Sequence, residues 1–147
     1  SHYNLRKNTC GAEVGDESLL IELVHGLASE EIIGFSPAEL PGYLNAADLL
    51  LLTSSREGSP NTVKEAMACN LPIVSTDVGD VRQVLGKAHN CAICDPIPND
   101  LARGIQTVLK DSVRSDGRSR ISHLASDTIA ARIVEVYRHA LEEGGRP

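Results

Sequence analysis

Two aliphatic runs with a helix-sized segment between them constrain the fold of this chain most. Residues 49–52 are four consecutive leucines within a strand expected over 48–53, and a second strand is expected over 71–76. Uninterrupted apolar runs of this length are typical of parallel strands buried on both faces. Between them, Ser59 and Pro60 provide the N-cap and first residue of a helix whose inner face carries Val63, Ala66 and Met67. The order strand, helix, strand predicts a parallel sheet.

The same alternation continues along most of the chain. Ser36 and Glu39 have the spacing of a capping box, and Asn99 or Asp100 is the expected cap of a later helix. Residues 112–120 are expected to form a polar surface helix or loop. Helices are predicted at 17–29, 36–47, 59–69, 80–85, 100–109 and 127–142, with further strands at 31–35 and 91–94. The predicted fold class is α/β, a Rossmann-like parallel sheet with helices on both faces, in one domain over residues 1–147.

Composition excludes several classes of function. The 147 residues are 41% hydrophobic and 23% charged, a balance typical of a soluble globular domain. A formal charge of −6, only 3% aromatic residues and no tryptophan argue against binding to nucleic acid through phosphates or stacked bases. No apolar run approaches the length of a membrane span, and the first residues do not resemble a signal peptide. We therefore expect a cytoplasmic protein.

Four cysteines allow two interpretations. Cys91 and Cys94 have the spacing of a redox motif or of half a zinc site, but Cys10 and Cys69 are isolated and complete neither. The segment 91–94 is itself predicted to be a strand, whereas redox motifs of this kind open a helix after a strand. We therefore favour buried thiols that act as small hydrophobic side chains.

The chemistry of the chain is concentrated between the two aliphatic runs. Glu57 lies in the turn after the first strand, and Glu65 lies in the following helix. The carboxyl ends of strands in an open α/β sheet are where polar ligands bind. Ionised carboxylates accept hydrogen bonds from hydroxyls, and the amides at a helix N-terminus suit phosphate. The combination predicts a nucleotide-sugar as ligand.

Residues 57–65 also resemble the Glu-x7-Glu motif of the retaining glycosyltransferases called group 1, or family 4, which have GT-B architecture. The segments 65–74 and 76–79 are similar to further family motifs, and the resemblance covers roughly residues 17–142. It implies the C-terminal, donor-binding domain, truncated at its N-terminal side, with residues 1–16 a poorly matched leader. It also implies that the N-terminal acceptor domain is missing and that the isolated chain is inactive.

The resemblance further implies a role for each motif residue. Glu57 would contact hydroxyls of the donor sugar and is the catalytic candidate, and Glu65 would accept from the ribose hydroxyls. The sugar would be transferred with retention of configuration, without metal or other cofactor. The backbone amides expected to line the sugar-phosphate region belong to Gly58, Ser59, Asn61 and Thr62.

Partners and pathway follow from the same resemblance. The form of the motif is similar to that of enzymes in bacterial surface polysaccharide or glycoconjugate synthesis. We expect a nucleotide-sugar donor as partner, and peripheral membrane association only through the parent protein. The nucleotide base, the sugar, the acceptor and the oligomeric state are not determined by the sequence.

Other interpretations stay open at this point. On pattern alone, Glu65 is a solvated helix glutamate, Glu57 a loop charge, and Gly58 and Ser59 turn and cap residues. Lys64 suits a position beside a diphosphate as well as an exposed helix surface. A non-catalytic module that keeps the fold and serves as a scaffold is the alternative function.

Overall fold

The fold is built on a parallel sheet, seen in a computed structural model that describes residues 36–110 and 113–144. Strand β1 (Leu50–Leu52) pairs with β2 (Ile73–Thr76), and β2 pairs with β3 (Cys91–Cys94). Both pairings are parallel, with Leu51 opposite Val74 and Val74 opposite Ala92. The strands predicted at 48–53, 71–76 and 91–94 are confirmed. The predictions for 1–16, 17–29 and 31–35 lie outside the described residues.

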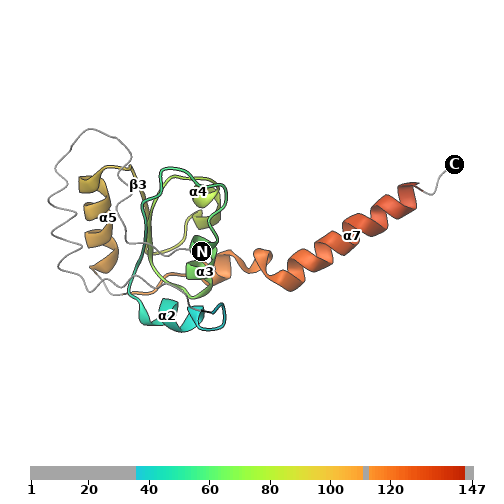
Figure 1. Cartoon of the computed structure of the whole chain (residues 1–147), viewed down its shortest axis with the longest axis horizontal. Coiled ribbons are helices and arrows are strands. Elements are labelled where there is room, and N and C mark those ends of the chain that lie inside the picture. The colour runs from blue at the N-terminus through green and yellow to red at the C-terminus, as the bar shows by residue number, and fades with distance from the viewer. Residues whose placement is uncertain (1–35, 111–112, 145–147) are drawn as a thin grey trace.

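Helices cover both faces of this sheet (Figure 1). On one side lie α2 (Leu40–Ala46), α3 (Asn61–Ala68) and α4 (Val81–Leu85), and on the other lies α5 (Pro98–Leu109). Adjacent residues of β2 enter the two cores separately: Ile73 packs with the side chains of α2, α3 and α4, and Val74 packs with those of α5. Both are fully buried. The predicted α/β class, with helices on both faces of a parallel sheet, is confirmed.

The capping box before α2 forms only in part. The Glu39 carboxylate accepts hydrogen bonds from the Ser36 amide (2.8 Å) and the Ser36 hydroxyl (2.9 Å). These bonds lower the pKa of Glu39, the amide bond contributing most. The helix nevertheless begins at Leu40, after a turn, and not at Pro37.

Two other predicted caps are wrong. Helix α3 begins at Asn61 with Pro60 as its N-cap, and the Ser59 hydroxyl bonds to Asp80 instead of capping the helix. Helix α5 begins at Pro98, so Asp100 lies in its first turn. The Asp100 carboxylate accepts from the Asp95 amide at 2.8 Å, which ties the helix to the end of β3. In both cases a partner outside the helix, an acceptor for Ser59 and a donor for Asp100, competes with the local backbone for the side chain.

The segment after α5 is held more tightly than its polar sequence predicts. Ser115 and Gly117 are buried, and Gly117 opens the short helix α6 (Gly117–Arg120). A Cβ at Gly117 would lie 2.8 Å from the Met67 Cα, so only glycine permits this approach of α6 to α3. The prediction of a surface loop or helix is therefore correct for the exposed side of α6 and wrong for its buried side.

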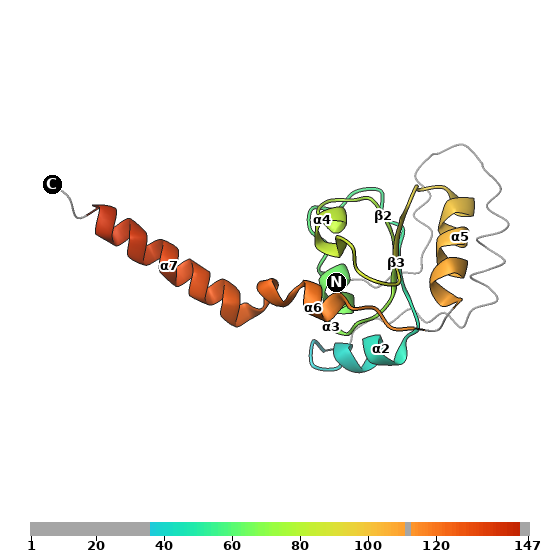
Figure 2. The same cartoon turned by 180° about the vertical axis from the view of Figure 1, so that it is seen from behind.

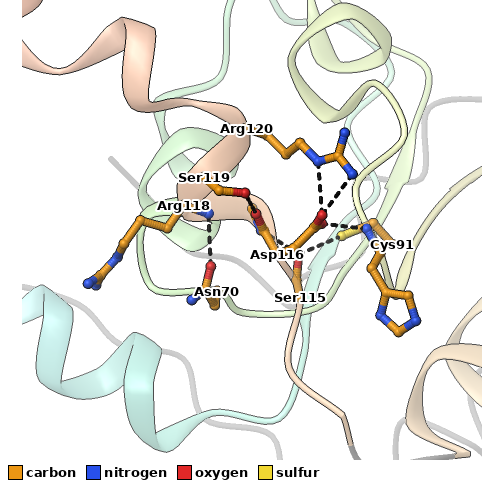
Figure 3. Close-up of polar contacts among 9 residues, drawn as sticks. Asn70, Cys91, Ser115, Asp116, Arg118, Ser119 and Arg120 are labelled. Carbon is orange, nitrogen blue, oxygen red and sulfur yellow. Dashed lines mark hydrogen bonds and ion pairs between the residues drawn. The ribbon is translucent and has the colours of Figure 1, made fainter.

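Polar contacts fasten this segment at the N-terminal end of the sheet (Figure 3). Asp116 accepts from the His89 amide at 2.6 Å and from Arg120 at 2.9 Å. Asn70, just after α3, accepts from the Arg118 amide at 2.8 Å. These bonds join α6 to the residues that precede β2 and β3. We assign this cluster a structural role.

The two cysteines of strand β3 behave as packed thiols. Cys94 is buried and Cys91 is half-buried, 3.5 Å from the Ser115 hydroxyl. Burial is the main cause that raises the pKa of both thiols, which keeps them protonated. Their side chains belong to the two cores, one on each face of the sheet.

The chain continues through a 3-10 turn, η1 (Ser122–Leu124), into helix α7 (Ser126–Gly144), which contains the predicted final helix. Helix α7 projects away from the sheet and its covering helices (Figure 2). Its large apolar side chains are therefore exposed, Leu141 to 77%. The others are Ile133, Val134, Val136 and Tyr137. None of the helices in the described part of the chain combines the length and apolar character of a membrane span.

Candidate functional site

The candidate site lies where the strands end at their carboxyl side. Beyond β1, residues 53–60 form the loop that leads to α3, and residues 77–80 lead from β2 to α4. Because parallel strands end at the same edge of a sheet, these two loops are neighbours there. A hydrogen bond from Ser59 to Asp80 and a close backbone approach of Gly79 to Gly58 join the two loops into one surface.

Glu57 is exposed on the first loop, and its position is fixed by the loop itself. The Ser54 hydroxyl donates to Glu57 Oε1 at 2.9 Å. Ser54 is in turn anchored to the neighbouring strand, because its carbonyl accepts from the Thr76 hydroxyl at 2.6 Å. The carboxylate is therefore presented to solvent from a tied backbone and keeps a second oxygen for an incoming hydroxyl.

Two glycines bring the loops into direct contact. Gly79 has φ of +54°, and a Cβ built on it would lie only 2.2 Å from the Gly58 carbonyl oxygen. Gly58 itself is exposed, and a Cβ there would meet no atom within 4 Å. The loop after β2 thus supports the turn at Gly58 from one side, while the other side of that turn faces open space.

A charged group lies beside the same turn. The Ser59 hydroxyl donates to Asp80 Oδ2 at 2.6 Å, and Lys64 Nζ lies 3.3 Å from the same oxygen. Lys64 also donates to the Ser59 hydroxyl. The Ser59 hydrogen bond, followed by smaller effects of Lys64, lowers the pKa of Asp80 despite some desolvation. Asp80 is therefore ionised at neutral pH, and its charge offsets that of Lys64.

The remaining predicted residues lie on α3. Asn61 is exposed, whereas Thr62 and Glu65 are half-buried. The Thr62 hydroxyl oxygen is buried and has no hydrogen-bond partner within the described ranges. The amides of the first helical turn have no acceptor within the helix, and the helix dipole favours negative charge there. This end of α3 can therefore accept an anionic group.

The structure thus places the predicted residues in one continuous segment. Glu57, Gly58 and Ser59 form the turn, Asn61 and Thr62 the first turn of α3, and Glu65 lies one turn further along the helix. The sequence did not reveal the contact of Ser59 and Lys64 with Asp80. Asp80 is 21 residues from Ser59, and only the predicted adjacency of the two loops could have suggested it.

Comparison with known proteins identifies the family. The family model described as "Glycosyl transferases group 1" matches residues 6–111. The TuaC glycosyltransferase of Bacillus subtilis (strain 168), named for teichuronic acid biosynthesis, is 43% identical over 63 residues, which is 43% of this chain and 16% of TuaC. The MMP alpha-(1->4)-mannosyltransferase of Mycolicibacterium hassiacum is 31% identical over 133 residues, which is 85% of this chain and 32% of that protein.

A solved structure supports the same assignment. Sucrose-phosphate synthase from Thermosynechococcus elongatus superimposes with a TM-score of 0.71 and 25% identity, over 86% of this chain and 34% of that one. The chain spans between 16% and 32% of the length of the two curated relatives. The fold therefore corresponds to part of a GT-B enzyme. With the family model matched over most of its length, the chain belongs to the group 1 glycosyltransferases.

Proposed function

We propose that this chain is the donor-binding domain of a glycosyltransferase that uses a nucleotide-diphosphate sugar and transfers the sugar with retention of configuration. The observation that carries the proposal is the open turn at Gly58, placed between an exposed carboxylate on Glu57 and the N-terminus of α3. Acceptors for sugar hydroxyls and donors for phosphate thus lie side by side at the ligand-binding edge of the sheet.

Each residue has a role in this proposal that fits its position. Glu57, exposed and anchored through Ser54, accepts hydrogen bonds from the donor sugar. The amides of Gly58, Ser59, Asn61 and Thr62 face the diphosphate. Glu65, half-buried on α3, accepts from the ribose hydroxyls. The sugar, the diphosphate and the ribose of the donor would then each be bound by a different part of one strand-to-helix connection.

The chemistry that such a site supplies is positioning and charge stabilisation. As the bond between the sugar and the diphosphate breaks, negative charge grows on the leaving phosphate. Amides at the start of a helix are already oriented toward that charge, so little reorganisation is needed during the reaction. Glu57 holds the sugar in the orientation required for attack. We expect no metal requirement, which a binding measurement in the presence of EDTA would test.

The rest of the reaction belongs to the parent protein in this proposal. The acceptor would bind to a second, N-terminal domain, and the present chain alone would show no turnover. Similarity to TuaC supports a bacterial surface polysaccharide or a related glycoconjugate as the product. Any association with the membrane would occur through the parent protein, with the domain in the cytoplasm.

Calorimetric titration with UDP, GDP and their common sugar conjugates tests the proposal. The wild-type chain is expected to bind one base class saturably, and Glu65→Ala to weaken that binding about tenfold or more, as for loss of a charged hydrogen-bond acceptor. Glu135→Ala, an exposed glutamate on the projecting helix α7, is the matched control and should bind normally. Saturable binding that Glu65→Ala leaves unchanged would contradict the assignment. No binding at all would favour a non-catalytic scaffold.

A further inference from the structure

We propose that Lys64 and Asp80 are positioning residues that hold the turn at Gly58 in its donor-binding form, and that they act through the Ser59 hydroxyl rather than by touching the donor. This inference rests on the proposed function, because it concerns the same site. It adds two residues that lie outside the Glu-x7-Glu contacts and assigns them a mechanical role.

The geometry joins three segments at one hydroxyl. Ser59 donates to Asp80 Oδ2 at 2.6 Å and accepts from the Lys64 ammonium, while Lys64 and Asp80 lie 3.3 Å apart. Ser59 belongs to the turn, Lys64 to the second turn of α3, and Asp80 to the loop before α4. The hydroxyl therefore bonds in both directions, and the turn cannot move without breaking a charge-assisted bond.

Sterics limit how closely the turn can approach the loop after β2. Gly79, the residue before Asp80, has its Cα so close to Gly58 that an added Cβ would overlap the Gly58 carbonyl. The contact stops the turn from moving closer to the loop after β2, and the Ser59 bonds stop it from moving away from that loop. Gly58 then keeps its open side toward the space where the proposal places the diphosphate.

Partial burial makes these bonds effective. The Lys64 and Asp80 side chains are 24% and 31% exposed, so solvent screens the pair less than it screens a fully exposed ion pair. The charge of Lys64 is already balanced by Asp80, which argues for a structural use of the ammonium over a direct use on phosphate. The two roles make opposite predictions for Asp80.

The experiment compares Lys64→Met, Asp80→Asn and the double variant for affinity toward whichever of UDP or GDP the wild-type chain binds. If the pair positions the turn, each single variant binds about tenfold more weakly, equivalent to 1.4 kcal/mol. The double variant should then resemble either single variant, because both break the same unit. Arg103→Met, which removes the cation of the exposed Asp100 pair on α5, is the matched control and should bind normally.

The sign of the Asp80→Asn effect separates the two roles. Removing a negative charge near an anionic ligand should strengthen binding if Lys64 contacts phosphate directly, since its ammonium would be released. Stronger binding by Asp80→Asn, or additive losses in the double variant, would overturn the positioning role. Weaker binding by Asp80→Asn, despite the favourable charge change, would support it.

NMR relaxation of backbone amides provides a readout that does not depend on nucleotide. In Lys64→Met and Asp80→Asn the order parameters of the Gly58 and Ser59 amides should fall from about 0.85 toward about 0.6, whereas those of β3 should keep wild-type values. Unchanged order parameters at the turn would refute the inference even if nucleotide binds. If the wild-type chain binds no nucleotide, the proposed function fails, and the order parameters at the turn alone decide whether the pair holds it.

Discussion

Replacing Gly79 by alanine should perturb the candidate site by forcing its two loops apart. An L-residue at φ of +54° costs about 1–2 kcal/mol because its Cβ approaches the backbone. At Gly79 the new Cβ would also lie 2.2 Å from the Gly58 oxygen and 2.9 Å from the Glu57 oxygen. The loops must separate by about 1 Å, and such overpacking typically costs 1–3 kcal/mol. We expect a total loss of about 3 kcal/mol in the free energy of unfolding.

Gly86→Ala is the matched control for this prediction. Gly86 has the same φ of +54°, but the nearest atom to its Cβ would be the Gln83 oxygen at 3.8 Å. Urea unfolding of the two variants, compared at equal m-values, isolates the contact between the loops as a difference of about 2 kcal/mol. Gly79→Ala should also lose nucleotide affinity, whereas Gly86→Ala should not. Equal losses of stability in both variants would refute the argument that Gly79 supports the turn.

Three further predictions concern stability and association. Because the pKa values of Asp80 and Asp116 are lowered in the folded chain, both carboxylates stabilise the fold at pH values above the pKa of the unfolded chain, which is near 4. Urea unfolding from pH 6 to 3 should show this stabilisation lost as the pH falls through the folded pKa values of the two groups. A free energy of unfolding that does not change with pH would contradict the prediction. Arg114 donates to the carbonyls of Ala47 (2.6 Å), Leu44 (3.2 Å) and Cys69 (2.9 Å). Arg114→Met should therefore lower the free energy of unfolding, measured in urea, by about 2 kcal/mol. A loss below about 0.5 kcal/mol would contradict the stabilising role of these bonds. The exposed apolar side chains of α7 should cause association that increases with concentration in sedimentation velocity experiments. Leu141→Glu should reduce this association. A wild-type chain that stays a monodisperse monomer would contradict the prediction.

The main elements could be predicted from the sequence because local patterns specify them. The four leucines at 49–52 and the apolar run over 71–76 correctly predicted strands β1 and β2, since uninterrupted apolar residues are typical of strands in a sheet covered on both faces. The apolar spacing of α3 and α7 gave two correct helices. The arrangement of the candidate site at the carboxyl edge then followed from the order of strands and helices alone.

Side-chain partners across the fold could not be predicted in the same way. Ser59 has every local property of an N-cap, yet it bonds to Asp80, which the sheet brings close from 21 residues away. Asp100 likewise bonds to the Asp95 amide. Polar side chains have several acceptors or donors within reach, and tertiary structure decides among them. The burial of Gly117 could not be predicted either, because glycine has no apolar side chain that would contribute to a hydrophobic pattern in the sequence.

The exposed face of α7 shows a different limit. The apolar stripe correctly predicted a helix, but a stripe does not say what covers it. In the structure Val136 and Leu141 are 68% and 77% exposed. Periodicity is a property of one segment, whereas burial depends on a second surface.

Titration of Gly58→Leu tests the central claim most directly. Gly58 is exposed and a Cβ there has no neighbour within 4 Å, so a leucine side chain should extend toward solvent and leave the free energy of unfolding unchanged within about 0.5 kcal/mol. The same space is where the account places the diphosphate, so the variant should bind the nucleotide recognised by the wild-type chain about tenfold more weakly or worse. Wild-type affinity in a stable Gly58→Leu protein would show that the donor does not bind at this turn.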